Sequence, residues 1–563
     1  MFRYLPFALR YLIWRLSHLY RRLRKPPDYV VFILEDAYPE LRPPRDHVWE
    51  RWFFPPPTSL QDLAEQFRTI AGDPRVRGVL LHLRSLYMPF AHLQTLRDLI
   101  KGLRAAGKHV AAWACSYDNA SYYVACAANE ILLQPGGSIS PLGLRRSFFF
   151  LADALNHVGV KADIVQISPY KSAADLFTRS QMSQEVRQMV NWLIDDHYAE
   201  FIRGVGEGRR LDEGRAKALV DNAPYTDLKA LEAGVVDKQI GEEDLPAYLG
   251  EDGKPARLAF WETAHQRLLR RPLPRPGRYV ALLRIEGDIV NGRSQRPPFK
   301  PPVPLPFLFN ERAGDLTVVQ KARRALADKR AAAVVVYVDS GGGSATASEA
   351  MAAALEKVSA TKPLIVAMGS VAASGGYYVA TPARWIVAQP GTITGSIGVL
   401  AGKIVSVGLL DKLLIHRETV SRGQHAGFYD IGRPFNEEER RRVWEDIHRI
   451  YDVFLDRVAA SRKMAREAVD AVGGGRVWTG RQAFERGLVD ELGGLDKALA
   501  KARQLAGLDD RAPVREIKVG KRPLAPRAEP NLVHYPLEGL RLFHQAGTLC
   551  LCPLIWEEVS KGI

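Results

Sequence analysis

Short runs of hydrophobic residues alternate along the chain with longer segments that have helical periodicity. The runs at 29–34 and 279–285 each open a region, and the runs at 78–83 and 333–338 each follow an amphipathic segment. Such runs, rich in Val, Leu and Ile and separated by helices, are typical of parallel strands buried on both faces. The pattern therefore predicts an α/β fold.

The two regions are copies of one module. Tyr122-Tyr123 recurs as Tyr377-Tyr378, and Gln-Pro-Gly follows both pairs at the same spacing. A repeat of this length indicates a duplicated domain rather than a solenoid. The chain of 563 residues is also too long for one hydrophobic core.

The repeat and the composition shifts predict five parts. They are an N-terminal segment at 1–27, a first domain at 28–263, a linker at 264–277, a second domain at 278–505 and a tail at 506–563.

The net charge is +15, and the first 25 residues carry six Arg and one Lys with no acid. Leucines recur among these charges at helical spacing, but no stretch between charges approaches the roughly 20 apolar residues of a membrane span. We expect a basic amphipathic helix that lies on an anionic membrane surface. Packing against the protein's own body is the alternative. The pattern does not favour a cleaved signal peptide or binding to nucleic acid.

Each module carries an insertion rich in proline and aromatic residues, at 41–57 and 296–309. We expect irregular surface loops there, or else apolar rims that touch a membrane or a peptide. We expect Cys115 and Cys126 to be buried free thiols. Cys550-Leu-Cys552 supplies too few ligands for a zinc site. No metal, cofactor or disulfide framework is expected.

The second module contains the elements of a nucleophilic site. Ser374-Gly-Gly follows a buried strand, and the glycine loop that ends at Gly343 follows the preceding strand. The backbone N–H groups of Gly343 and Gly375 would converge on one oxyanion. A glycine loop can also bind phosphate, but phosphate-binding loops of this kind end in a lysine, and this loop has none.

The repeat splits the remaining chemistry between the modules. Asn119 stands where the second copy has Ser374, and Lys171 stands where the second copy has Gln424. A buried lysine loses hydration, which favours the neutral amine that can serve as a base for a serine. His416, His425 and His448 are rival bases without a recognisable triad context. We therefore expect Lys171 and Ser374 to meet, in one chain or between neighbours, with the same chain favoured.

These motifs resemble the signal peptide peptidase A (protease IV) family in its long tandem form. The shared signatures are Tyr170-Lys171-Ser-Ala, Ser340-Gly-Gly-Gly343, Ala373-Ser374-Gly-Gly, Thr394-Gly-Ser396 and the closing Gly487-Leu-Val-Asp490. The resemblance covers about residues 28–505. It implies two tandem crotonase/Clp-protease-like domains built of repeated ββα units, and a homotetramer.

The same resemblance implies a role for each site residue. Ser374 would be the nucleophile, Lys171 the general base and Ser396 the residue that orients the lysine, while Gly343 and Gly375 would donate to the oxyanion. The sequence departs from the family at Gly341, where a proline is usual, and in the first module, where Ser-Leu-Tyr-Met replaces the glycine loop. The membrane span usual at the start of the long form is also missing.

The prediction is a serine endopeptidase with a Ser–Lys dyad that cleaves apolar peptides, such as remnant signal peptides, at the bacterial inner membrane. A cytoplasmic location is the alternative. Rival functions are an acyl-thioester hydrolase or isomerase of the same fold, and a non-catalytic membrane scaffold.

Overall fold

The structure is a computed structural model, and it describes residues 7–44, 56–271, 273, 277–297, 310–519 and the backbone of 548–551. The chain divides into two compact units. The first comprises Met1–Arg145, His197–Pro276 and Lys561–Ile563, and the second comprises Arg146–Asp196 and Gly277–Ser560. The two proline-rich insertions fall largely outside the described residues.

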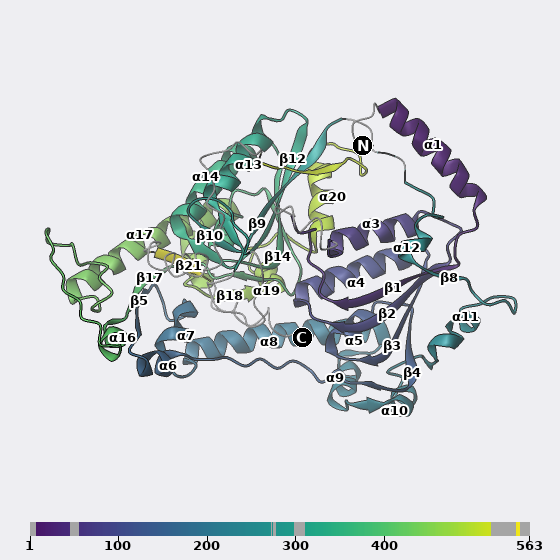
Figure 1. Ribbon diagram of the computed structural model, residues 1–563, viewed down its shortest axis with the longest axis horizontal. Coiled ribbons are helices and arrows are strands. Elements are labelled where there is room, and N and C mark those ends of the chain that lie inside the picture. The colour runs from purple at the N-terminus through teal and green to yellow at the C-terminus, as the bar shows by residue number, and fades with distance from the viewer. Residues whose placement is uncertain are drawn as a thin grey trace. The chain divides into compact units, whose positions relative to one another are not determined.

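The first unit is built on a mostly parallel sheet with the strand order β6-β4-β3-β2-β1-β8, and β7 pairs with β4 (Figure 1). The central strands are almost wholly apolar and buried, as expected for strands covered on both faces. The strands are β1 (Tyr29–Asp36), β2 (Gly78–Leu86), β3 (His109–Tyr117), β4 (Glu130–Ile139), β6 (Tyr225–Thr226), β7 (Lys238–Gln239) and β8 (Leu258–Phe260).

Helices follow the strands of this unit as the hydrophobic pattern predicts. Ser59 caps α3 through a capping box with Asp62, and Asp118 caps α5 in the same way with Ser121. The helices are α3 (Leu60–Ala71), α4 (Phe90–Ala105), α5 (Asn119–Ala125), α9 (Glu213–Asp221), α10 (Asp227–Glu232), α11 (Leu245–Tyr248) and α12 (Trp261–Ala264). Helix α8 (Gln184–Arg209) contains the boundary between the units.

The second unit repeats this arrangement with the strand order β18-β16-β14-β12-β9-β20, and β15 pairs with β14. Its strands are β9 (Tyr279–Glu286), β12 (Ala331–Ser340), β14 (Leu364–Ala373), β15 (Trp385–Ala388), β16 (Ile393–Gly395), β18 (Val477–Thr479), β19 (Glu491–Leu492) and β20 (Val514–Glu516). Its helices are α13 (Asp315–Ala327), α14 (Ala345–Ser359), α15 (Gly375–Tyr378), α16 (Val407–Lys412), α17 (Glu437–Arg462), α18 (Arg466–Val472), α19 (Gly480–Glu485) and α20 (Leu495–Leu505).

The duplication extends to individual contacts. Arg209 pairs with Asp237 in the first unit, and Arg462 pairs with Asp490 in the second. Each of these aspartates also accepts the backbone N–H of the strand beside it, at 2.7 Å in both units. Duplicated domains of α/β class are therefore confirmed.

The second unit also holds a mixed sheet with the order β11-β10-β13-β21-β17-β5. Its strands are β5 (Lys161–Gln166), β10 (Asp288–Val290), β11 (Arg312–Gly314), β13 (Gly342–Ser344), β17 (Leu400–Val405) and β21 (Thr548–Leu551). β5 pairs with β17 along its whole length, antiparallel. This sheet joins three stretches of chain that are far apart in the sequence.

The chain from 146 to 196, expected in the first domain, packs with the second unit. It contains β5, α6 (Ala152–His157), η2 (Ser172–Ala174) and α7 (Asp175–Thr178), and it runs into α8. Met189 and Leu193 of α8 share a hydrophobic cluster with Ile393 and Val477. The arm that carries Lys171 is thereby built into the second unit.

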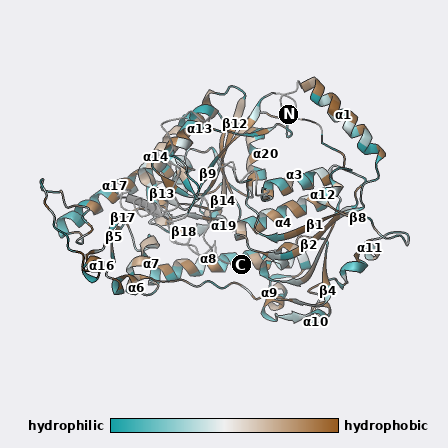
Figure 2. Cartoon of the chain, viewed as in Figure 1, coloured by the Kyte–Doolittle hydropathy of each residue, from teal (hydrophilic) through white to brown (hydrophobic). Residues whose placement is uncertain are grey.

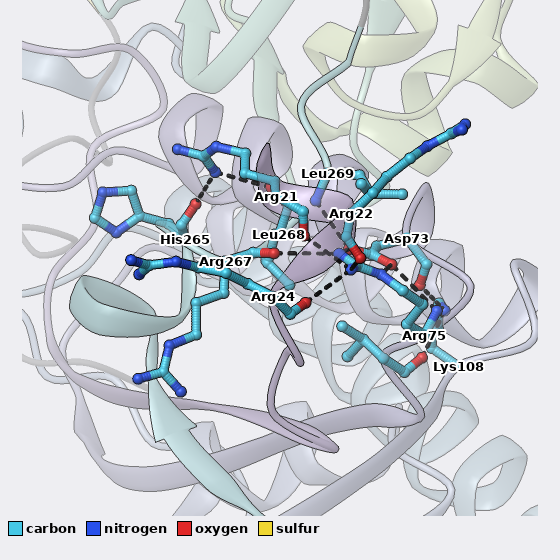
Figure 3. A network of polar contacts seen from close by, with 11 residues as sticks. Arg21, Arg22, Arg24, Asp73, Arg75, Lys108, His265, Arg267, Leu268 and Leu269 are labelled. Carbon is cyan, nitrogen blue, oxygen red and sulfur yellow. Dashed lines mark hydrogen bonds and ion pairs between the residues drawn. The ribbon is translucent and has the colours of Figure 1, made fainter. Parts of the chain in front are cut away.

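Helix α1 (Phe7–Leu23) is anchored to the first unit at its C-terminal end (Figure 3). The buried guanidinium of Arg21 donates to the carbonyls of His265 and Leu268 at 2.5 and 2.8 Å. Arg75 donates to the carbonyls of Arg21 and Arg24 at 3.0 Å each. Part of the expected linker at 264–277 is therefore packed structure, and Leu268 is fully buried.

Candidate active site

Ser374 stands between β14 and α15 in a conformation that few side chains adopt. Its φ of +56° lies in the left-handed region, where a non-glycine residue is strained. Its N–H donates to the carbonyl of Gly395 at 2.8 Å. Its hydroxyl makes no capping bond to α15. The sharp turn thus points the hydroxyl away from the helix that follows, as in a nucleophile elbow.

The side chain of Lys171 ends at this hydroxyl. Its Nζ lies 2.7 Å from Ser374 Oγ, 3.0 Å from Ser396 Oγ and 3.0 Å from the Ser396 carbonyl oxygen. Lys171, Ser374 and Ser396 all have no exposed surface. Three neutral oxygens therefore surround an amine that is removed from water, and removal from water favours the neutral form of an amine.

Ser396 is itself held in the left-handed region, with φ of +50°. Its N–H donates to the carbonyl of Arg476 at 2.7 Å, which ties the turn after β16 to the strand entry before β18. Both its hydroxyl and its carbonyl thereby face Lys171.

The two candidate oxyanion glycines lie close together. A Cβ added to Gly375 would lie 3.1 Å from Gly342 Cα and 3.3 Å from Gly343 N. A Cβ added to Gly343 would lie 2.1 Å from the carbonyl oxygen of Ile289, and Gly343 has φ of +146°. Only glycine fits at 343, and a side chain at 375 would be tightly crowded. The structure thus brings all five predicted site residues together within the second unit.

Residues 473–478, which we call the docking segment, contact the arm that carries Lys171. A Cβ added to Gly475 would lie 2.6 Å from Lys171 Cα. The Ser168 hydroxyl donates to the carbonyl of Gly474. The carbonyl of Arg476 accepts the hydrogen bond from the Ser396 N–H. The docking segment therefore contacts both the arm that carries Lys171 and the turn that carries Ser396.

A column of stacked side chains continues this contact. The Arg476 guanidinium lies 4.2 Å from the Tyr170 ring centroid, and the Tyr170 ring stacks on Trp192 at 6.2 Å. Trp192 stacks on Trp478 at 4.8 Å, and the Arg486 guanidinium lies over the Trp478 ring, 3.9 Å from its centroid. Cation–π and aromatic contacts of this kind stabilise by about 1 kcal/mol each. Tyr170 directly precedes Lys171, so the column helps to fix the lysine backbone.

The glycines at 473–475 and Trp192 of the column were not predicted from the sequence as parts of the site. The three consecutive glycines at 473–475 were a usable signal, because such a run before a predicted strand marks a close backbone approach or left-handed conformation. Trp192 carried no comparable signal.

Asp175 is a second ionisable group close to Lys171 in sequence. Its side chain is buried, and burial raises the pKa of its carboxyl to about 6, against a smaller opposing effect of Arg179. The Arg179 Nε lies 3.2 Å from Asp175 Oδ2. Ionised Asp175 therefore carries a cost in the folded state.

The equivalent place in the first unit has no nucleophile. The Asn119 side chain donates to the carbonyl of Gly143 at 2.7 Å instead. Of the rival bases, His416 and His425 are exposed, and His448 contacts the carbonyl of Trp444 at 3.0 Å. Among the described residues, the group that contacts the Ser374 hydroxyl is Lys171.

Several known proteins are similar to this chain over most of its length. The model of "Peptidase family S49" matches residues 102–253 and 356–509. The chain is 31% identical over 460 residues to "Serine protease SPPA, chloroplastic" of Arabidopsis thaliana, a match that covers 80% of this chain and 66% of that protein.

Two bacterial proteins give similar matches. The chain is 31% identical over 510 residues to "Protease 4" of Haemophilus influenzae, covering 86% of this chain and 78% of that protein. It is 30% identical over 469 residues to "Protease 4" of Salmonella typhi, covering 80% and 72%. The chain therefore belongs to peptidase family S49, and it is a serine protease of the signal peptide peptidase A (protease IV) type with two tandem α/β domains.

Proposed function

We propose that this protease uses Ser374 and Lys171 as a catalytic dyad to hydrolyse apolar peptides. The observation that carries the proposal is the distance of 2.7 Å between Lys171 Nζ and Ser374 Oγ, in a site where both residues are fully buried. At this distance a neutral amine can accept the hydroxyl proton directly.

The proposed reaction follows from these groups. Ser374 Oγ attacks the peptide carbonyl carbon while its proton passes to Lys171 Nζ, and the N–H groups of Gly343 and Gly375 stabilise the oxyanion. The protonated lysine then gives the proton to the leaving amine. Water hydrolyses the acyl-enzyme, with Lys171 again accepting a proton.

Helix α1 supports a membrane surface as the place of action. Hydrophobic and hydrophilic residues alternate along it in the hydropathy colouring (Figure 2), and Leu12, Leu16, Leu19 and Leu23 are 53–83% exposed. In the described part of the chain, no helix has the length and hydropathy needed to cross a bilayer. An exposed apolar stripe with flanking arginines suits binding in the plane of an anionic membrane. Remnant signal peptides, which are apolar, would be met there.

Labelling with an active-site phosphonate tests the dyad. We expect mass spectrometry to find the adduct on Ser374 in the wild-type protein, and labelling at least about 10³-fold slower in Lys171→Met, because a base-assisted step is lost. Lys171→Met keeps the length of the side chain, and circular dichroism would check that it folds. Labelling at the wild-type rate in that variant would overturn the role of the lysine. The tetramer implied by the family resemblance stays a prediction.

A further inference from the structure

The chain passes from one sheet to the other at the glycine loop. β12 ends at Ser340 in the sheet that holds β9 and β14, β13 begins at Gly342 in the mixed sheet, and Gly341 alone joins them. Gly342 has φ of +106° and Gly343 has φ of +146°. Three consecutive glycines have little preference of their own for one backbone conformation. The direction of the Gly343 N–H therefore depends on the contacts that hold the loop.

The side chain of Ser340 makes two such contacts. Its hydroxyl donates to the carbonyl of Gly287 at 2.6 Å and accepts the N–H of Gly342 at 3.2 Å. Gly287 is the single residue between β9 and β10, and its own N–H donates to the carbonyl of Asp339 at 2.9 Å. Ser340 is 2% exposed. The hydroxyl thus ties the first amide of β13 to a turn that is itself bonded to the end of β12.

The same strand end contacts the elements on either side of the nucleophile. A Cβ added to Gly376, two residues after Ser374, would lie 2.3 Å from the carbonyl oxygen of Ser340. The carboxylate of Asp339 accepts the N–H of Val371 in β14 at 3.0 Å. The end of β12 is therefore packed against both the strand that leads to the nucleophile and the helix that follows it.

The first module provides an internal comparison. Ser85 corresponds to Ser340 at the spacing of the repeated tyrosine pairs, and its side chain is exposed. Tyr87, in the place of Gly342, donates its N–H to the carbonyl of Asp36 at 2.8 Å. The module without a nucleophile therefore holds this amide through the neighbouring strand. The buried serine contact accompanies the candidate active site and is not required by the fold.

We propose that Ser340 is a positioning residue that directs the Gly343 N–H toward the oxyanion. Its hydroxyl fixes the peptide plane that ends in the Gly342 N–H, so only the rotations at Gly342 remain before the next N–H in the chain. The inference rests on the proposed function, in which the Gly343 N–H is an oxyanion donor. Ser340 acts through this donor and makes no contact with the substrate.

Ser340→Ala tests the role of the hydroxyl in turnover. We expect kcat for a fluorogenic apolar peptide to fall about 10- to 100-fold, because one oxyanion donor loses its fixed direction. KM should change by less than about twofold, since the lost interaction acts in the transition state. Ser85→Ala is the matched control and should keep the wild-type kcat. A kcat of Ser340→Ala within about twofold of the control would overturn the proposal.

The peptide aldehyde acetyl-Leu-Leu-leucinal tests whether the loss arises at the oxyanion. On binding, Ser374 Oγ bonds to the aldehyde carbon, the carbonyl π electrons pass to the oxygen, and the serine proton passes to Lys171. The resulting oxygen occupies the place of the oxyanion. We expect the inhibition constant to rise in Ser340→Ala by about the factor by which kcat falls. An unchanged inhibition constant beside a reduced kcat would overturn the proposal.

Hydrogen exchange measured by mass spectrometry gives a readout that does not depend on catalysis. We expect the Gly342 amide to exchange at least about tenfold faster in Ser340→Ala than in the wild-type protein or Ser85→Ala. Equal exchange in all three proteins would overturn the anchoring of the loop. Failure of the dyad would show separately, as absence of a phosphonate adduct on Ser374 in the wild-type protein. Failure of this inference alone would leave that adduct in place, with exchange and kcat unchanged in Ser340→Ala.

Discussion

Gly475 lies directly against Lys171, and a Cβ at 475 would come within 2.6 Å of the Lys171 Cα, Cβ and N atoms. The backbone of the docking segment is therefore in van der Waals contact with the residue whose side chain reaches Ser374. Gly475 has φ of +87°, which also favours glycine. The position of the lysine depends on this contact.

Gly475→Ala should displace Lys171 and lower kcat about 100-fold, because misplacement of a catalytic group by about 1 Å has an effect of this size. The displaced amine would be better hydrated, so the acidic limb of the pH–rate profile should move to higher pH. Steady-state kinetics from pH 6 to 10 would measure both effects.

Gly474→Ala is the matched control for this variant. Gly474 is also left-handed, at φ of +62°, but its Cβ would meet the movable ends of Arg476 and Ser168 at 3.1 and 3.4 Å. We expect a loss of stability comparable to that of Gly475→Ala but a fall in kcat of less than about fivefold. The acidic limb of the pH–rate profile should stay at its wild-type position. Equal effects of the two variants on the pH profile would show that the contact with Lys171 does not position the amine.

Ser396→Ala removes one of the three oxygens around Lys171 Nζ and leaves the Ser396 carbonyl in place. We expect kcat to fall about 10- to 100-fold, corresponding to one hydrogen bond in a buried site, with little change in KM. Ser396→Gly should give the same loss, because it removes the same hydroxyl and tolerates the positive φ. A wild-type kcat in both variants would rule out an orienting role.

Gly375→Ala should lower turnover strongly. The new methyl group would lie 2.7 Å from Ser348 Oγ and 3.3 Å from Gly343 N, so it would push apart the two groups proposed to bind the oxyanion. A loss of about 100- to 1000-fold in kcat is expected from one displaced donor. In the double variant with Ser348→Ala the Tm should recover while kcat stays low. Recovery of kcat together with Tm would show that the strain, and not the donor geometry, was responsible.

Asp175→Asn should stabilise the protein at neutral and alkaline pH. The pKa of this carboxyl is raised to about 6 in the folded state, above its ordinary value of 3.8. The folded state therefore binds the proton more tightly, and stability falls as pH rises from about 4 to 6. Asparagine mimics the protonated form, so the variant should exceed the wild type by about 1–3 kcal/mol at pH 8 and match it near pH 4. Chemical unfolding at both pH values would check this, and a constant difference would contradict it.

Leu16→Gln combined with Leu19→Gln should weaken binding of the protein to vesicles that contain phosphatidylglycerol. Both side chains are about 60% exposed on α1, and burying two leucines in a membrane stabilises binding by several kcal/mol. We expect at least about a tenfold lower partition coefficient in co-sedimentation. Leu228→Gln combined with Leu231→Gln, on the exposed face of α10, is the control. If the α1 variant binds as well as the wild type, α1 is not the membrane contact.

The sequence was sufficient for the class of fold and for the choice of candidate residues, because both depend on local signals. Short apolar runs indicate buried strands, and recurring motifs such as Tyr122-Tyr123 and Tyr377-Tyr378 indicate the duplication. The turn at Ser374 and the glycine loop that ends at Gly343 can each be recognised from a few consecutive residues. The first module has no glycine loop, and Asn119 stands where the second module has Ser374. The sequence thereby indicated that the first module has no nucleophilic site of its own.

Only the tertiary structure decided which unit holds Lys171 and what surrounds the site. The arm from 146 to 196 leaves its own module because β5 pairs with β17 and α8 packs on Val477, and contacts between residues so far apart leave no periodic trace in the chain. The same holds for Gly475 against Lys171 and for β21 beside Gly343. Hydrophobic patterning determines that a face is buried, whereas the partner of that face depends on the packing of the whole unit.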